Sequence, residues 1–499
     1  MAGMALQKKH QDVIGLFTAL PRRRPMYRGI AGVVERAVVQ GTLAPSHRLP
    51  PERVLARALR VSRTTVVTAY RELESKGIVR GFVGRGTFIA ARPDSTSTPF
   101  AWRGKVSAAA LQANDSIVRD LVRAAGDPQV VSFAAGQPAL EVFPTAAFQR
   151  AVNTLLERQP LTIWRNGPTE GQWRFREAIA ARFGGRPEHI LVIAGAQQGL
   201  DLLVRCLVDP GDTVVIERPG YLGAIHSFRT AGARLVGWDI ERADVDELEE
   251  LLLRYRPKLM YLNPTHQNPT GATLPLRTRR AVLNLAERYR VPIVEDDTYR
   301  ELSLAGTPPP SLHVLDERQT AVIHLNTFSK MLAPGLRLGW IAAATPIVDQ
   351  LSLIKQRVDL HPQNLAQLAL SDMIENGVFD RHLEALRVEH RRRRDAMTRA
   401  LRQHVDASRL RFDVPDGGLF LWCRLGGGVQ ARAVQHHAHR HSMVFVPGDA
   451  FYADGAGAQE LRLCFTSQPA DRAVEAAQWL SDSIDRAARG GTRVRVPVA

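Results

Sequence analysis

The 499-residue sequence contains few cysteines, namely Cys206, Cys423 and Cys464. They lie far apart and form no CxxC pair, so their spacing excludes a disulfide framework and a cysteine zinc site. No uninterrupted apolar run approaches the roughly 20 residues of a membrane-spanning helix. Polar residues 8–12 stand where an export signal would need an apolar stretch. These absences predict a protein of the reducing cytoplasm with no membrane partner.

Acidic residues are scarce at the two ends of the chain. Residues 1–92 contain 17 Lys and Arg against 5 Asp and Glu, and the segment after Asp485 adds four Arg and no acid. The middle, 93–485, is neutral, so the net charge of +16 belongs to the ends. Positive charge confined to a short segment indicates a module that binds a polyanion. A basic surface that only faces solvent is the alternative.

The length predicts two or three domains. Residues 92–99 are turn formers and small polar residues, which are typical of a linker. The predicted segments are a basic extension (1–24), a basic domain (25–92), a linker (93–125), a large domain (126–485) and a disordered basic tail (486–499).

Two short helices are predicted within residues 51–76. The first places apolar side chains on one face, at Val54, Leu55, Ala58 and Leu59. After a turn at Arg60, Ser62 is a good N-cap for a second helix that runs to about Lys76. The apolar face of the second helix is Val66, Val67, Tyr70 and Leu73.

This arrangement places Arg63, Thr64 and Thr65 in the first turn of the second helix. In a helix-turn-helix, that end enters the major groove, where Arg can bind guanine and hydroxyls can reach bases or phosphates. Gly77 ends the helix, and residues 78–91 predict a two-stranded ribbon that turns at Gly84-Arg85-Gly86. An Arg at a glycine turn suits a minor groove or a phosphate.

The pattern LP.ER.LA, VSRTTV..AYREL and GRGTF resembles the winged helix of the GntR regulator family over about 65 residues. The resemblance implies that Arg53, Ser62, Arg63, Thr64, Thr65, Arg85 and Gly86 face DNA. One departure is Arg60, where the family usually has glycine, and an L-residue in left-handed geometry costs ~1–2 kcal/mol. A helix pair that serves only as an interaction module is the alternative.

In the large domain, short apolar runs alternate with amphipathic helix-like stretches. The runs at 190–193, 213–216, 259–262, 292–295 and 322–325 are nearly continuously apolar. Such strands separated by helices predict an α/β domain with a mostly parallel sheet covered on both faces.

Four local patterns in this domain point to one site. Lys330 ends a strand beside hydroxyls and a cation, which suits a Schiff-base lysine, and Thr327, Ser329 and Arg337 suit a phosphate. Asp296 leaves another strand where a pyridinium nitrogen would need a buried carboxylate, with Tyr299 nearby; a helix N-cap acid pair is the alternative. Further candidates are Asn268 for a ring hydroxyl, Gly195, Ala196 and Gln197 as an anion cradle at a helix start, and Tyr221 for ring stacking.

The motifs GAQQGL, ERPGYLGA, HQNPTG, EDDTY and TFSKMLAPGLRLGW, in that order, resemble fold-type I aminotransferases over roughly residues 126–485. The resemblance implies a pyridoxal 5′-phosphate domain with a small C-terminal α+β subdomain. It implies that Lys330 forms the internal aldimine, Asp296 binds the pyridine nitrogen, and Asn268 and Tyr299 bind the ring hydroxyl. It assigns Tyr221 to stacking and Arg462 to a ligand carboxylate. The other candidates, Gly195, Ala196, Gln197, Thr327, Ser329 and Arg337, would surround the phosphate.

A GntR winged helix joined to this domain is similar to the MocR-type subfamily. Two departures are residues 163–167, which replace the usual aromatic YG.P.G stretch, and Asn268, where many such regulators carry an aromatic residue. A histidine run at 436–441 places His437 and His441 four apart, but no acid or cysteine stands in the run, so we expect no metal site.

The resemblance implies a homodimeric, cytoplasmic transcription regulator that binds double-stranded operator DNA. It would sense pyridoxal phosphate or an amino compound through the aldimine on Lys330, with coupling of about 1–3 kcal/mol to DNA binding. A working aminotransferase with an accessory DNA-binding domain is the first alternative. A repressor whose cofactor site binds no ligand is the second.

Overall fold

The computed structural model describes residues 16–17, 26–39, 42–43, 47–82, 86–90 and 130–489. The chain divides into two compact units, with the boundary between Val106 and Ser107. This boundary falls in the predicted linker 93–125, which lies outside the described residues. The predicted extension 1–24 is described only at residues 16–17.

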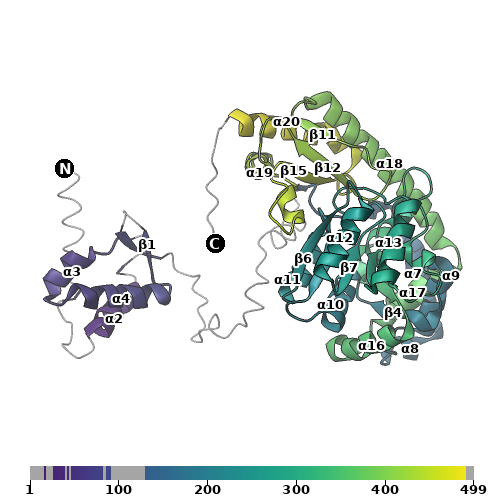
Figure 1. Cartoon of the computed structure of the whole chain (residues 1–499), viewed down its shortest axis with the longest axis horizontal. Helices are drawn as coiled ribbons and strands as arrows, with labels where there is room; N and C mark the ends of the chain where they lie inside the picture. The colour runs from purple at the N-terminus through teal and green to yellow at the C-terminus, as the bar shows by residue number, and fades with distance from the viewer. Residues whose placement is uncertain are drawn as a thin grey trace. The chain divides into compact units, whose positions relative to one another are not determined.

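The first unit is a helix-turn-helix followed by a β-hairpin (Figure 1). Its elements are α2 (Met26–Val39), α3 (Glu52–Leu59), α4 (Arg63–Ser75), β1 (Val79–Phe82) and β2 (Gly86–Ile89). The two strands pair antiparallel, with Phe82 opposite Gly86. The Ser62 hydroxyl accepts a hydrogen bond from the Thr65 N–H at 3.1 Å, so it caps α4 as predicted.

The turn after α3 has the predicted backbone conformation, whereas α3 buries a different set of side chains from the one predicted. Arg60 has φ 52° and ψ 45°, the left-handed conformation predicted for this turn. The predicted apolar face of α3 was partly wrong, because Val54 is 44% exposed and Ala58 is exposed, whereas Ala56 is buried. An eight-residue helix that packs on one neighbour buries only a narrow stripe, and here Leu55 and Ala56 form it.

The second unit is built on a seven-stranded sheet in the order β4-β10-β9-β8-β7-β5-β6. Its strands are β4 (Ile190–Ile193), β5 (Thr213–Arg218), β6 (Arg234–Asp239), β7 (Leu259–Leu262), β8 (Ile293–Asp296), β9 (Val322–Thr327) and β10 (Gly339–Ala342). Neighbours pair parallel except at β10, which is antiparallel to β4 and β9. The mostly parallel sheet is therefore confirmed, with one reversed strand.

Helices cover both faces of this sheet. Buried residues of α10 (Ala196–Leu207), α11 (Leu222–Thr230) and α16 (Thr345–Asp359) pack on one face. Those of α12 (Val245–Tyr255) and α13 (Leu276–Tyr289) pack on the other. The carboxyl ends of β5, β7, β8 and β9 meet at one edge of the sheet, where parallel α/β sheets bind ligands.

A smaller α+β domain adjoins the large sheet (Figure 1), with strand order β11-β12-β15-β14. Its elements are β11 (Leu410–Phe412), β12 (Phe420–Leu425), α19 (Ala431–Ala438), β14 (Val446–Pro447), β15 (Glu460–Cys464) and α20 (Ala473–Arg489), with α18 (Val378–His404) packed against α20. The predicted disordered tail began too early, because α20 continues to Arg489 and buries Leu480 and Ile484 against this domain. Residues 490–499 lie outside the described residues.

The remaining elements lie around the large sheet and against the small domain. They are β3 (Val131–Ser132), α7 (Thr145–Arg158), α8 (Pro160–Trp164), α9 (Trp173–Phe183), α14 (Leu312–Leu315), α15 (Phe328–Met331), α17 (Asn364–Glu375) and β13 (Met443–Val444). Among the described helices, none has both the length and the hydropathy required to cross a membrane.

Candidate functional site

Lys330 lies in the short helix α15, directly after β9 ends at Thr327. Its Nζ donates a hydrogen bond to the Gly136 carbonyl at 2.6 Å. Burial, together with the smaller effect of the cations Arg462 and Arg337, lowers the pKa of this amine from 10.5 to about 8. The neutral, nucleophilic form is therefore accessible near neutral pH.

Asp296 is the last residue of β8, and its carboxylate is held from two directions. Oδ2 accepts from the Tyr261 hydroxyl at 2.6 Å, and Oδ1 accepts from the Thr298 hydroxyl at 2.5 Å. Burial raises the pKa of Asp296, and these hydrogen bonds oppose the rise. Because each carboxylate oxygen has two lone pairs, Asp296 can still accept a hydrogen bond from a ligand.

Asn268 connects two other predicted site residues. Its Nδ2 donates to the Tyr299 hydroxyl at 3.3 Å, and its Oδ1 accepts from Arg462 Nη1 at 2.7 Å. Arg462 Nη2 donates to the Ala134 carbonyl at 2.6 Å, whereas its Nε has no partner among the described residues. The guanidinium lies 4.0 Å from the Phe420 ring centroid, so this buried cation is held by contacts on several sides.

The predicted anion cradle lies between β4 and α10. Gly195 has φ 85°, and a Cβ there would come within 2.9 Å of Arg337 Nη2, so the position requires glycine. The helix α10 begins at Ala196, and the first N–H groups of a helix lack partners within it. The Arg337 guanidinium donates to the Ala194 carbonyl at 2.8 Å, which places a cation beside these N–H groups.

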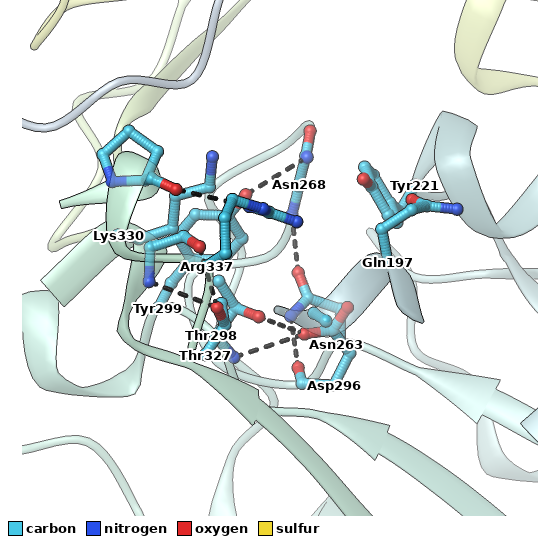
Figure 2. Close-up of a pocket in the computed structure, with 13 residues that line it drawn as sticks. Gln197, Tyr221, Asn263, Asn268, Asp296, Thr298, Tyr299, Thr327, Lys330 and Arg337 are labelled. Carbon is cyan, nitrogen blue, oxygen red and sulfur yellow. Dashed lines mark hydrogen bonds between the residues drawn. The ribbon is translucent and has the colours of Figure 1, made fainter. Parts of the chain in front are cut away.

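These groups surround a cavity of about 160 Å³. Figure 2 shows Tyr221 and Gln197 on one side of it and Lys330 and Tyr299 on the opposite side. The residues that line the cavity are Ala196, Gln197, Tyr221, Asn263, Asn268, Asp296, Thr298, Tyr299, Thr327, Ser329, Lys330, Pro334 and Arg337. Every predicted cofactor residue except Gly195 therefore lines the cavity. Gly195 directly precedes Ala196, which does line it.

Three residues of the site escaped the sequence analysis as functional candidates. Tyr261 lies within the apolar strand β7, and Thr298 lies between two predicted site residues; both bond the Asp296 carboxylate. Asn263 donates from its side chain to the Asp296 carbonyl and accepts from the Asn268 N–H. The only signal in the sequence was that Asn263 follows directly after a strand.

The donor set fits pyridoxal 5′-phosphate. The ring nitrogen requires a buried carboxylate, and the aldehyde requires an amine, here the partly buried Lys330. The phosphate requires an anion site, here a glycine cradle with a helix N-terminus and an arginine. Thr327 and Ser329 add hydroxyls 3.0 Å apart beside the amine. The unpartnered Arg462 Nε is a donor that a bound carboxylate could satisfy.

The predicted DNA-facing residues lie at the start of α4 and nearby. Arg53, Ser62, Arg63 and Thr64 are exposed, and Thr65 and Gly86 are partly exposed. Arg85 lies outside the described residues. Arg63 donates to Glu52 Oε2 from both Nε and Nη2, at 3.2 and 3.0 Å, so this guanidinium is paired with the N-terminus of α3.

The histidine run does not form one helical face. The helix α19 ends at Ala438, and residues 439–441 form a 3-10 turn. The His441 Nε2 lies 3.1 Å from Asp482 Oδ2, and the His441 ring stacks on Trp479. Over the described residues, no three His, Cys, Asp or Glu side chains come together as metal ligands.

Two protein families match this chain. Residues 128–477 match aminotransferase class I and II, and residues 26–89 match the bacterial regulatory proteins of the gntR family. A 2-aminoadipate transaminase of Thermus thermophilus is 35% identical over 77% of this chain and 98% of that protein. The probable rhizopine catabolism regulatory protein MocR of Rhizobium meliloti is 31% identical over 85% of this chain and 86% of that protein.

A solved structure shares the fold of the second unit. It is LysN, an α-aminoadipate aminotransferase from Thermus thermophilus complexed with N-(5′-phosphopyridoxyl)-L-leucine, with a TM-score of 0.74 and 34% identity. The alignment covers 78% of this chain and 99% of LysN.

The second unit is therefore a fold-type I domain of the aminotransferase class I and II family, whose cofactor is pyridoxal 5′-phosphate. With a GntR helix-turn-helix in the same chain, the protein belongs to the MocR-type subfamily of GntR regulators.

Proposed function

We propose that this protein is a transcription regulator whose operator binding responds to pyridoxal phosphate or to an amino compound. The observation that carries the proposal is the joining of an exposed, basic helix-turn-helix to a complete cofactor cavity in one chain. Relatives of the regulator kind extend across both parts. Because it acts on chromosomal operators, the protein works in the cytoplasm.

The cofactor, when bound, supplies an aldehyde that condenses with amines and a ring that withdraws electrons. Lys330 would attach it through Nζ, and Asp296 would accept a hydrogen bond from the ring nitrogen. Asn268 and Tyr299 would hold the ring hydroxyl, and Tyr221 would stack on the ring. The phosphate would be held by Gly195, Ala196, Gln197, Thr327, Ser329 and Arg337.

The Lys330 amine is the group with which an amino compound would compete for the aldehyde of the cofactor. Arg462 would bind the carboxylate of such a ligand, because its Nε is unpartnered and its Nη groups can exchange their bonds to Asn268 and Ala134. The bond from Arg462 to Asn268 connects the small domain with the large sheet, since Arg462 lies on β15 and Asn268 follows β7. A rearrangement of this connection would alter how the helix-turn-helix units are presented.

We also propose that the chain is a homodimer, which would bind two half-sites on the operator. An exposed apolar surface in the second unit supports self-association, on two segments that the 3.3 Å contact between His361 Nε2 and Asn166 Oδ1 brings together. Leu161 and Trp164 of α8 are 62% and 70% exposed, and Leu353, Val358 and Leu360 of the α16 region are 48–59% exposed. Large apolar side chains gathered on one surface are typical of interfaces.

The proposal is tested by retardation of DNA from the region upstream of the gene. The full chain, with and without pyridoxal phosphate and with a panel of amino acids, is compared with Lys330→Ala. We expect a specific complex whose affinity changes about 5–150-fold with the effector, the usual range of allosteric coupling. A Lys330→Ala chain that keeps both the visible absorbance of the cofactor and the DNA response would contradict the proposal.

A second candidate is a working aminotransferase. It is favoured by Asn268, which lines the cavity at a position where many regulators of this kind carry an aromatic residue. It is also favoured by the alignment with the Thermus transaminase, which covers 98% of that protein. Rapid turnover of an amino acid and a keto acid, unchanged by deletion of residues 1–92, would support it. Slow turnover together with effector-dependent DNA binding would favour the regulator.

A further inference from the structure

A hydrogen-bonded series of polar side chains adjoins the anion cradle and lies outside the cavity lining. Gln198, in the first turn of α10, accepts from the Ala194 N–H through Oε1 at 2.7 Å. Its Nε2 donates to Asp359 Oδ2, also at 2.7 Å. Asp359 ends α16, and its Oδ1 accepts from Lys355 Nζ at 2.7 Å. The side chain of Lys355 is completely buried.

The donor and acceptor types of these groups determine the direction of each hydrogen bond in the series. A backbone N–H only donates and a carboxylate only accepts, so the Gln198 amide has one orientation that satisfies both neighbours. The Lys355 ammonium only donates, so the Asp359 Oδ1 that it contacts accepts this bond. Such a buried charge needs its partner, because an unpaired one is costly.

The backbone of Ala194 is thereby held at both its N–H and its carbonyl, which belong to two successive peptide units. Gln198 binds its N–H, and Arg337 Nη2 binds its carbonyl at 2.8 Å. Gly195 follows with φ 85°, and α10 begins with the N–H groups of Ala196 and Gln197, which lack partners within the helix. A shift of the backbone at Ala194 would therefore move these donors.

We propose that Gln198, Asp359 and Lys355 are positioning residues for the phosphate of the cofactor. Gln198 touches the backbone of the cradle, Asp359 and Lys355 act through Gln198, and none of the three lines the cavity. Together they align the N–H groups of the cradle through Ala194. This inference rests on the proposed function, which places the phosphate at residues 195–197. A purely structural role would instead be to fasten α16 to α10.

The two roles differ in their dependence on the phosphate. The cofactor-free full chain is titrated with pyridoxal phosphate and with pyridoxal, which carries the aldehyde but no phosphate, and visible absorbance is recorded. For Gln198→Leu we expect about tenfold weaker binding of pyridoxal phosphate, the value of one or two hydrogen bonds, and pyridoxal affinity within about twofold. For Asp359→Asn we expect a smaller loss of the same kind, because an amide can keep only one of the two bonds.

A matched control is Gln435→Leu, which removes another partly buried glutamine that donates to the Phe445 carbonyl, in the small domain. It should leave both affinities unchanged. Equal losses for the two aldehydes, or no loss for pyridoxal phosphate in either test variant, would overturn the inference and leave the proposed function intact. A wild-type chain that binds neither aldehyde would overturn both.

Discussion

Replacing Lys330 with methionine in the cofactor-free chain should increase the free energy of unfolding at pH 7. The Lys330 side chain is partly buried at the cavity, and this burial lowers the pKa of its amine from 10.5 to about 8. At pH 7 the folded protein therefore holds an ammonium group away from water, whereas the unfolded chain hydrates it. Methionine has a similar length and no charge.

The magnitude follows from the displacement of the pKa. A difference of about 2.5 pKa units, at 1.36 kcal/mol per unit, opposes folding by about 3.4 kcal/mol at pH 7. The substitution also removes the 2.6 Å hydrogen bond to the Gly136 carbonyl. Losing that partner costs about 1–3 kcal/mol, so a net gain of about 1–2 kcal/mol is expected.

The effect should depend on pH with a definite sign. Between the folded pKa of about 8 and the unfolded value of 10.5, the unfolded chain binds a proton that the folded chain has released. The stability of the wild type therefore rises with pH across this window, and the unfavourable contribution is complete below pH 8. The methionine variant lacks this contribution, so its advantage should shrink from pH 7 to pH 10.

Urea unfolding followed by tryptophan fluorescence measures this difference. Six of the seven tryptophans lie in the second unit and none lies in residues 26–92, so the signal reports mainly on the cofactor-binding unit. Lys355→Met is the matched control, because that buried lysine is paired with Asp359 and its loss should destabilise the protein. A Lys330→Met chain less stable than wild type at pH 7, or an advantage that is equal at pH 7 and pH 10, would refute the reasoning.

Three further predictions concern single substitutions. Asp296→Asn should weaken pyridoxal phosphate binding at least about tenfold, measured by absorbance titration, because a neutral amide does not stabilise a protonated ring nitrogen; unchanged affinity would contradict the assigned role. Glu52→Gln should reduce the ratio of specific to non-specific DNA affinity, because Glu52 holds the Arg63 guanidinium in place. Competition with unrelated DNA measures this ratio, and a ratio equal to that of the wild type would show that the pairing does not matter for DNA binding. Trp164→Asp should shift the chain toward a monomer in sedimentation, because it puts a charge on the exposed apolar surface; an unaltered sedimentation coefficient would exclude this surface as the dimer contact.

The sequence by itself determined the features that depend on neighbours along the chain. The cap at Ser62, the left-handed Arg60 and the buried strand at 190–193 all lie where local signals place them. Caps, turns and apolar periodicity act over a few residues, so they can be read without the fold. The fold-type I architecture followed from motifs in a characteristic order.

Only the tertiary structure decided which distant residues meet. The Tyr261 hydroxyl reaches the Asp296 carboxylate because β7 and β8 are neighbours in the sheet. The bond from Arg462 to Asn268 joins residues 194 positions apart. No local pattern encodes such pairings, because they arise where the carboxyl ends of parallel strands converge and the small domain packs against them. The sequence therefore predicts the parts of the site, and the packing of the sheet decides how they are held.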